Sequence, residues 1–274
     1  MDEEFRSAYG PWAIVAGAGA GMGAAYARQL ADRGLSLLLV DRDPAPIQEL
    51  AVELTDGSDV MCRPVALDLG SPDAPDTVLS HCESLDVGLF VANAAASYVG
   101  PFPDQDAASF ELQLRVNALT PTTIIHGLLP RFEARERSGV IIMSSLSSRR
   151  GAPLVATYAA TKAYLAVLAE SLWDELRDRG VDVLGVLPGS TRTPGWLSSN
   201  PQEGSGTATV MEADEVVEEA LDALGHGGPT LVPGQANRDA ERFLESLERV
   251  EAVKLVGQVM RETYPGAGGA EPRG

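Results

Sequence analysis

Two side chains that can move a proton lie four residues apart in this sequence, at Tyr158 and Lys162. Residues at positions i and i+4 of a helix share one face, so we expect the Lys162 ammonium to lie beside the Tyr158 phenol. A nearby cation favours the phenolate and should lower the pKa of the tyrosine from about 10 toward working pH. Ser145 lies thirteen residues before the tyrosine, just after the apolar run 140–143. A tyrosine tuned in this way can act as a general acid or base, although a tyrosine–lysine pair alone is a common coincidence on surface helices.

A second candidate site is the glycine-rich segment 17–23, which lies between the apolar run 12–16 and a stretch of helical pattern. The backbone of such a turn can approach a pyrophosphate closely, and the helix N-terminus that follows favours an anion. The next apolar run ends at Asp41, eighteen residues after Gly23. This spacing is close to that of a carboxylate that binds the ribose of a dinucleotide, whereas the alternative is a tight turn followed by a capping aspartate.

The two residues at the end of that second run bear on which dinucleotide binds. Asp41 should accept hydrogen bonds from the ribose hydroxyls and repel a 2′-phosphate, which favours NAD. Arg42 could instead clamp a phosphate, so NADP is the alternative. No basic residue stands within the glycine turn to add a second clamp. The cofactor-binding residues predicted from this part of the chain are Gly17, Gly19, Gly21, Met22, Gly23, Asp41 and Arg42.

The elements that must position these residues follow from the spacing of the apolar runs. Short apolar runs recur along the chain and are separated mostly by segments of helical length and pattern. This alternation predicts a Rossmann-type doubly wound α/β fold, with a seven-stranded parallel sheet and helices on both faces. The predicted strands are 12–16, 35–40, 60–66, 87–92, 140–143, 181–187 and 230–232.

The chain divides into three predicted parts. Residues 1–236 form the dinucleotide-binding catalytic domain, in which 193–210 is predicted to be a mobile substrate loop or else a plain surface connection. In residues 237–264, apolar side chains recur at spacings of three and four, which predicts an amphipathic helix. The apolar face of this helix could pack on its own domain or on another subunit. Residues 265–274 are predicted to be a disordered tail.

Composition argues against several other classes of protein. The formal net charge is −18 and no basic stripe is present, so nucleic acid is not an expected partner. No run approaches the ~18 apolar residues of a membrane span, and the acidic start lacks an apolar signal segment, so we expect a soluble cytoplasmic protein. Cys62 and Cys82 form no metal or disulfide motif and are expected to be buried, reduced thiols. The three histidines are isolated, so no metal site is expected.

With the glycine turn, Asp41, Ser145, Tyr158 and Lys162 in this order, the chain resembles the short-chain dehydrogenase/reductase family over about residues 10–236. The family's GxxxGxG pattern is matched by Gly17, Gly21 and Gly23.

Further segments carry the same resemblance. Residues 91–95 are similar to the family's NNAG motif, although Ala92 and Ala95 replace its first Asn and its Gly. Residues 187–193 resemble the PG motif, whose backbone and threonine hold the nicotinamide carboxamide. The run 9–13 is similar to the branch that contains hydroxysteroid dehydrogenases and 3-ketoacyl reductases.

The resemblance implies a role for each catalytic residue. Tyr158 would be the general acid for carbonyl reduction and the base for alcohol oxidation. Lys162 would lower its pKa and bind the nicotinamide ribose, while Ser145 would orient the carbonyl oxygen. Asn117 would hold a water that relays protons to Lys162. The cofactor-binding residues that the resemblance adds are Asp68, Leu69, Asn93, Ala94, Tyr158, Lys162, Pro188, Gly189, Thr191 and Thr193.

These expectations together predict an oxidoreductase that transfers a hydride between a nicotinamide cofactor and a secondary alcohol or ketone, with an apolar small-molecule substrate. One alternative is an NADPH-dependent carbonyl or 3-ketoacyl reductase, in which Arg42 would engage the 2′-phosphate. Another is a non-catalytic dinucleotide sensor, which would be expected to lose the tyrosine or the lysine. We expect a homodimer or homotetramer.

Overall fold

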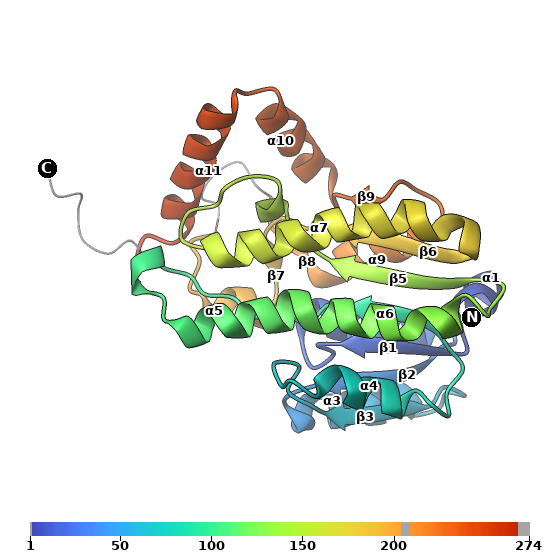
Figure 1. The fold of residues 1–274 in the computed structure, drawn as a ribbon. Helices are drawn as coiled ribbons and strands as arrows, with labels where there is room; N and C mark the ends of the chain where they lie inside the picture. The colour runs from blue at the N-terminus through green and yellow to red at the C-terminus, as the bar shows by residue number, and fades with distance from the viewer. Residues whose placement is uncertain (1, 204–208, 268–274) are drawn as a thin grey trace, which may run out of the picture.

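A seven-stranded sheet forms the centre of the computed structural model, which describes residues 2–203 and 209–267. Its strands lie in the order β3-β2-β1-β4-β5-β6-β9, and each neighbouring pair is parallel (Figure 1). The predicted fold class is confirmed. The strands are β1 Trp12–Ala16, β2 Ser36–Asp41, β3 Cys62–Ala66, β4 Val87–Ala92, β5 Ser138–Met143, β6 Val181–Val186 and β9 Thr230–Leu231.

The burial of the strands follows their place in the sheet. Every residue of β1, β4 and β5 is buried, because helices cover both faces of the sheet centre. β3 lies at the edge and is largely exposed. It contains Pro64, which has no N–H to donate to a further strand. The continuous apolar runs of the sequence therefore mark the central strands most clearly.

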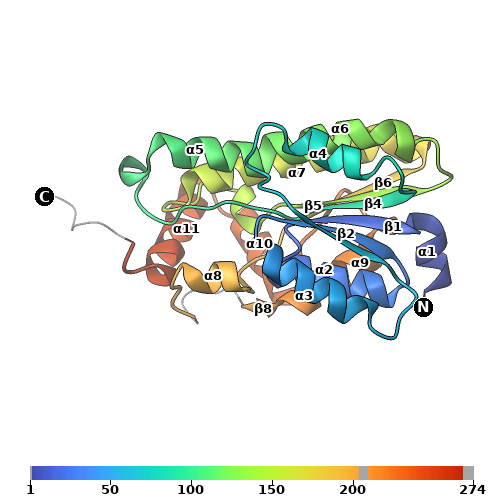
Figure 2. The same cartoon turned by 90° about the horizontal axis from the view of Figure 1, so that it is seen from below.

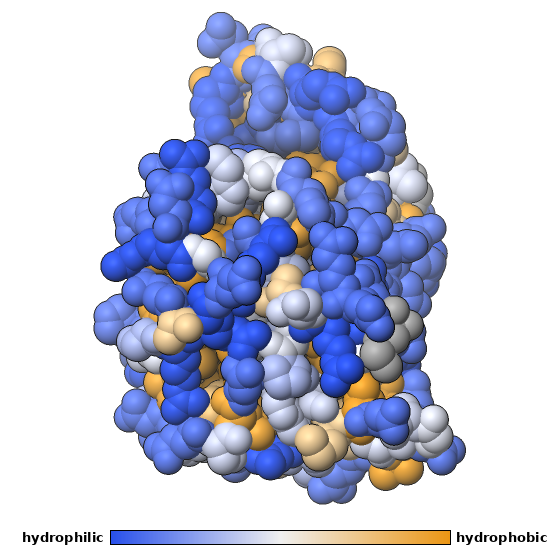
Figure 3. All heavy atoms as spheres, turned by 90° about the vertical axis from the view of Figure 1, so that its right-hand side faces the viewer, coloured by the Kyte–Doolittle hydropathy of each residue, from blue (hydrophilic) through white to orange (hydrophobic). Residues whose placement is uncertain are grey.

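Two layers of helices enclose the sheet. Helices α4 to α7 cover one face, and α2, α3 and α9 cover the other (Figure 2). The short α1 lies at the amino ends of the strands, an end whose surface is mainly hydrophilic (Figure 3). These helices are α1 Glu3–Tyr9, α2 Gly21–Asp32, α3 Pro44–Thr55, α4 Ala74–His81, α5 Ala107–Leu114, α6 Thr120–Phe132, α7 Ala156–Leu176 and α9 Ala213–Ala223. Single turns are η1 Phe102–Asp104, η2 Arg115–Leu119, η3 Leu146–Ser148 and η4 Arg177–Arg179.

The end of the chain differs from the sequence-based expectation of one amphipathic helix. It forms two helices, α10 Gln235–Glu245 and α11 Arg249–Thr263, which stand beyond the sheet as a hairpin (Figure 1). On α11, Val256 and Met260 pack against the protein's own apolar cluster around Ala159. The apolar face of α11 thus docks on its own domain. Of the predicted tail, residues 268–274 lie outside the described residues.

The predicted substrate loop, 193–210, contains a short helix, α8 Pro194–Ser198. It is flanked by β7 Thr191–Arg192 and β8 Met211–Glu212, which pair with each other. Residues 204–208 lie outside the described residues, so the mobility of this loop stays a prediction.

The described part of the chain contains no helix that is long and apolar enough to cross a membrane. Both cysteines are free thiols, with Cys82 buried and Cys62 partly buried. Within residues 2–203 and 209–267, no group of His, Cys, Asp or Glu side chains is arranged to hold a metal ion.

Candidate active site

The glycine turn follows β1, at the point where the strand order reverses between β1 and β4. Ligands bind at such reversals because the loops after neighbouring strands leave in opposite directions. Gly17 and Gly21 have positive φ angles of 76° and 54°, which favour glycine. A Cβ atom on Gly23 would lie 1.8 Å from the carbonyl oxygen of Gly17. Asn93, just after β4, donates its Nδ2 to that same oxygen over 2.9 Å. At these positions the turn thus offers backbone rather than side chains to a pyrophosphate.

Asp41 lies over this turn from the end of β2. Its Oδ2 accepts a hydrogen bond from the N–H of Gly19 at 2.9 Å, and its Oδ1 accepts one from Asp43 at 3.2 Å. The N-cap of the following helix α3 is Asp43, so Asp41 is not a helix cap. A carboxylate beside the turn is suitably placed for ribose hydroxyls. The neighbouring Arg42 is exposed.

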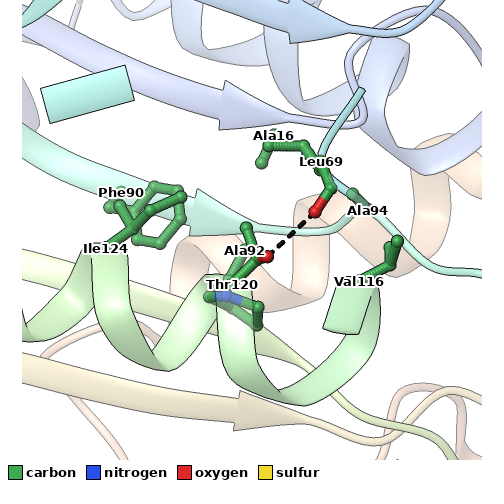
Figure 4. Close-up of a pocket in the computed structure, with 9 residues that line it drawn as sticks. Ala16, Leu69, Phe90, Ala92, Ala94, Val116, Thr120 and Ile124 are labelled. Atoms are coloured by element: carbon green, nitrogen blue, oxygen red, sulfur yellow. Dashed lines mark hydrogen bonds between the residues drawn. The ribbon is translucent and has the colours of Figure 1, made fainter. Parts of the chain in front are cut away.

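The loops on the other side of the turn are held by a packed apolar cluster. Thr120 donates a hydrogen bond to the carbonyl oxygen of Leu69 over 2.8 Å, which fixes the loop that also carries Asp68 (Figure 4). Leu69 and Ala94 line a cavity of about 10 Å³ here. A cavity of this size holds at most one water. The side chains around it support the loops at the candidate cofactor edge. The cavity itself is too small for a substrate.

Ser145 and Tyr158 meet beyond the carboxyl end of β5. Ser147 donates to Ser145 Oγ from its backbone N–H at 3.2 Å and from its hydroxyl at 3.0 Å. Because Ser145 Oγ accepts these two bonds, its own proton is free to be donated to the Tyr158 hydroxyl or to a substrate oxygen. Ser147 was not predicted from the sequence, where it reads as one of several serines in a turn.

Lys162 lies one turn after Tyr158 on α7 and is 2% exposed. Its ammonium lies 5.5 Å from the centroid of the Tyr158 ring and donates a hydrogen bond to the Met143 carbonyl oxygen at 2.7 Å. The predicted pairing on one helix face is therefore present. Burial of such a cation is unfavourable, which points to a chemical use for it.

The pKa values of Tyr158 and Lys162 depart from their usual ranges in opposite directions. Burial raises the pKa of Tyr158 to about 12, and a hydrogen bond with the Ser145 side chain partly offsets this. Burial lowers the pKa of Lys162 to about 8. The expectation that Lys162 lowers the pKa of Tyr158 is wrong for this structure, because removal of the phenol from water has the larger effect. Tyr158 is thus protonated at neutral pH, the state that a general acid requires.

Asn117 lies in a π-helical turn, η2, between α5 and α6. Its side chain accepts from Ala96 N at 2.7 Å and donates to Ala96 O at 2.8 Å and to Thr161 Oγ1 at 3.0 Å. Both amide protons are therefore used, and a relay water would have to bind its backbone carbonyl. Pro121, four residues later, has no N–H to donate to that carbonyl. The sequence thus contained a signal for the π-helical turn.

The PG segment joins the glycine turn to the catalytic segment. The N–H of Leu146 donates to the Pro188 carbonyl oxygen at 2.9 Å. Thr191 is buried and donates to the Gly189 carbonyl oxygen at 3.2 Å. Thr193 caps α8, and its side chain lies beside the α-carbon of Gly21, where a Cβ would be 2.8 Å from Thr193 Cγ2. Met22, also predicted to bind cofactor, is partly buried and packs on the apolar core.

The structure also contains a pocket of about 680 Å³, which is within the usual size range of small-molecule sites. Its walls come from the segment after β4, the segment around α8 and the end of α11. Tyr264, at that end, is 8% exposed, and Met260 in the preceding turn of α11 packs against the same apolar cluster as Tyr158. The hydrogen-bonding side chains of the lining are Ser97, Tyr98, Ser198, Ser199, Asn200, Gln202 and Tyr264. Four of them, Ser198, Ser199, Asn200 and Gln202, lie in the predicted substrate loop 193–210. Ser97, Tyr98 and Tyr264 were not predicted, because these positions carry no motif.

A family model described as short chain dehydrogenase matches residues 11–204, which is more than half of the chain. The chain belongs to the short-chain dehydrogenase family. A 7beta-hydroxysteroid dehydrogenase from Clostridium sardiniense is 31% identical over 255 residues, which cover 93% of this dehydrogenase and 97% of the relative. The predicted family and its hydroxysteroid dehydrogenase branch are confirmed.

Two solved structures resemble this dehydrogenase over most of its length. One, from work on 7beta-hydroxysteroid dehydrogenase stereoselectivity, has a TM-score of 0.85 and 28% identity, and covers 92% of this chain and 98% of its own. Another is a short-chain dehydrogenase from Sphingobium yanoikuyae in complex with NADPH, with a TM-score of 0.77, 29% identity and coverage of 87% and 97%. This dehydrogenase is an oxidoreductase that uses NAD or NADP and interconverts a secondary alcohol and a ketone.

Proposed function

We propose that this dehydrogenase acts on a bulky, mainly apolar secondary alcohol or ketone of hydroxysteroid-like size, with Tyr158 as the proton donor in the reductive direction. The observation that carries the proposal is the meeting of Ser145, Tyr158 and buried Lys162. Tyr264, which lines the large pocket, is close enough to Tyr158 to influence its pKa. A ketone oxygen bound there would receive a hydrogen bond from Ser145 and a proton from Tyr158. A nicotinamide bound at the PG segment would supply or accept the hydride.

Lys162 has two roles in this proposal. Its charge, present below the pKa of about 8, would stabilise the phenolate that is left after Tyr158 gives up its proton. Its ammonium would also bind the nicotinamide ribose. The backbone carbonyl of Asn117 would hold a water that returns the proton, since the side chain of Asn117 is already engaged.

For the cofactor we propose a preference for NAD. Asp41 supports it, because its carboxylate already accepts a hydrogen bond from the glycine turn at 2.9 Å and would repel a 2′-phosphate at the adjoining ribose. The opposing features are the exposed Arg42 and the NADPH bound to the Sphingobium relative. The predicted cofactor contacts of Asp68 and Leu69 belong to the same proposal, which the hydrogen bonds that hold their loop support.

The chemistry of the pocket supports the substrate class. Its lining combines neutral hydroxyl and amide groups with Val99, Pro201 and Pro265. Such a surface suits a large ring system that carries a few hydroxyl or keto groups. The 31% identical relative is named as a hydroxysteroid dehydrogenase, which agrees with this class. The loop 193–210 would order over the substrate, which is still a prediction.

We also propose a homodimer or homotetramer in the cytoplasm. Large apolar side chains stand exposed in the helical layer that contains α5 to α7, at Leu114 on α5, Leu119 on η2 and Val167 on α7. Such side chains gathered on one face are typical of a subunit contact. The two free thiols agree with a reducing compartment. Light scattering on the purified chain tests the assembly.

Turnover with a panel of ketones tests the proposal. NADH and NADPH would each be offered with a hydroxysteroid-type ketone, a 3-ketoacyl thioester and a small ketone, and loss of reduced nicotinamide would be followed by absorbance. We expect the highest kcat/KM with NADH and the steroid-type ketone. Cofactor binding without turnover of any ketone would instead favour the non-catalytic sensor.

A further inference from the structure

Helix α10 carries two buried polar side chains on one face. Asn237 is 1% exposed and Glu241 is 7% exposed, and their spacing of four residues places them on the same side of the helix. Burial of an amide or a carboxylate is unfavourable unless its polar atoms are paired. A helix that only packed on the domain would be more stable with apolar residues at both positions. The two side chains therefore call for another explanation.

Asn237 lies directly behind the PG segment. A Cβ atom on Gly189 would be 2.8 Å from Asn237 Oδ1, so the amide is in contact with the Gly189 backbone. Asn237 Nδ2 donates to the Pro233 carbonyl oxygen at 3.0 Å, which fixes the plane of the amide. Its Oδ1 is buried and has no hydrogen-bond partner in the described part of the chain. The side chain thus has its oxygen against the loop that would hold the nicotinamide.

Glu241, one turn later, reaches the segment that joins Ser145 to Tyr158. Its Oε2 pairs with Arg150 Nη1 at 2.7 Å, and both side chains are buried. Its Oε1 lies 4.0 Å from Arg149 Nε. Arg150 lies midway along this segment, so the ion pair between its guanidinium and Glu241 ties the segment to the C-terminal hairpin.

Arg149 extends this connection to the catalytic helix. Its guanidinium lies 3.5 Å from Glu170 Oε1 on α7 and donates to Thr230 Oγ1 on β9 at 3.3 Å. Arg249 on α11 donates to the backbone oxygen of Arg149 at 2.9 Å. The segment after Ser145 is therefore held by α7, β9, α10 and α11 together.

We propose that Asn237 and Glu241 are positioning residues: Asn237 seats the Pro188–Gly189 turn against the nicotinamide, and Glu241, through Arg150, sets the geometry between Ser145 and Tyr158. The inference rests on the proposed function. It assigns to α10 two separable effects, one on the nicotinamide end of the cofactor and one on proton transfer. Small displacements of reacting groups reduce rate steeply, so both effects should be measurable.

The first experiment separates the nicotinamide end of the cofactor from its adenosine end. Asn237→Ala should weaken NAD binding about tenfold and leave the affinity for ADP-ribose, which lacks the nicotinamide, within about twofold. The control is Asp239→Ala, on the exposed side of the same helix, which should bind both ligands normally. Equal weakening of NAD and ADP-ribose, or unchanged NAD affinity, would overturn the role of Asn237.

The second experiment separates positioning from stability. Removing Glu241 alone leaves Arg150 buried and unpaired, which can unfold the protein, whereas apolar replacement of both partners is often neutral. Arg150→Met/Glu241→Leu should therefore keep Tm within a few degrees and lower kcat about tenfold, with NAD affinity within about twofold. The matched control replaces the pair Arg238–Glu219, whose side chains are 34% and 36% exposed and which also anchors α10, and should keep kcat.

A stable Arg150→Met/Glu241→Leu variant with wild-type kcat would overturn the role of Glu241. A variant that loses kcat together with thermal stability, seen as a lower Tm, would also overturn it. Loss of packing alone would explain that result. Wild-type protein without turnover of any ketone would instead be a failure of the proposed function, so the two failures are distinguishable.

Discussion

The two ends of the central sheet use polar side chains in different ways. At the amino end, Asp182 accepts a hydrogen bond from the Tyr9 hydroxyl at 2.6 Å and pairs with Arg137 Nε at 2.6 Å. The side chains of Arg137 and Asp182 are 35% and 25% exposed, so water still reaches the pair. The guanidinium also lies over the Tyr9 ring, 5.4 Å from its centroid. This network fastens α1 and the strand ends while its two charged groups stay partly in water.

At the carboxyl end the polar groups are buried more deeply. Lys162, Asn117 and Asn237 are each at most 2% exposed, and the ammonium of Lys162 has been removed from water without a carboxylate beside it in the described residues. Placing charge in this way lowers stability and raises reactivity. The difference indicates that the amino end stabilises the fold, whereas the carboxyl end gives up stability for chemistry.

The sharpest contrast is expected between Lys162→Met and Asp182→Asn. Lys162→Met should lower turnover about 100-fold or more and weaken cofactor binding, because the phenolate and the ribose both lose the ammonium. Since the folded protein disfavours charge at this position, the same change should raise the free energy of unfolding by about 1–2 kcal/mol. Asp182→Asn should do the reverse, with unchanged turnover and about 1 kcal/mol less stability. Denaturant titration and steady-state kinetics on both variants test this; a destabilised Lys162→Met would contradict the contrast.

The pH dependence of ketone reduction should report the same buried cation. The pKa of Lys162 is lowered to about 8, so its ammonium is present below that pH and is lost as the pH rises through it. We expect kcat/KM for reduction to fall about tenfold per pH unit above about 8. Lys162→Arg keeps its charge at these pH values and should move the fall upward. A profile of the wild type that stays flat to pH 10 would exclude this use of the cation.

Cofactor choice should depend on the Asp41 carboxylate, which also lies at the carboxyl end of the sheet. Asp41→Ser removes the carboxylate next to the ribose and frees Arg42 to bind a 2′-phosphate. The ratio of kcat/KM for NADP to that for NAD should rise by about tenfold, or ~1.4 kcal/mol. The preference for NAD is wrong if the wild type already favours NADP, and Asp41 has no part in selection if the ratio does not move.

The smallest expected effect concerns the pocket wall. Tyr264→Ala should raise KM for a bulky ketone severalfold, about 1 kcal/mol, and leave a small ketone unaffected. Tyr264→Phe keeps the ring and should separate the contribution of the hydroxyl. Tyr164→Ala, on the exposed side of α7, is the control. Equal changes in KM for large and small ketones would show that Tyr264 does not shape the substrate site.

The sequence predicts the frame of the molecule well, because strand burial and glycine geometry are local properties. The run before Gly17 is buried along its whole length, and Gly17 and Gly21 have the conformations that the motif requires. The alternation of apolar runs and helical segments predicts the parallel sheet in the same way, although not the order of its strands. These features need no knowledge of distant contacts.

Features that depend on distant contacts were missed or wrong. The apolar spacing of three and four continues through residues 246–248, yet the helix is interrupted there. As a result, α10 and α11 dock on different parts of the site. The pKa of Tyr158 was expected to fall, but the burial that raises it could not be predicted from a helix pattern. Asn237 and Glu241 resemble ordinary surface residues in sequence, because nothing local distinguishes a buried polar face from a solvated one.

The most direct test of the central claim is the rate of hydride transfer in Tyr158→Phe. Protein saturated with reduced cofactor would be mixed with excess ketone, and a single turnover would be followed at the absorbance of the reduced nicotinamide. If the Tyr158 hydroxyl is the proton donor, the rate should fall by about 10² to 10⁴ while the dissociation constant of the cofactor changes less than about twofold. Retention of more than about a tenth of the wild-type rate would contradict the assignment of the carboxyl end as an active site built around Tyr158.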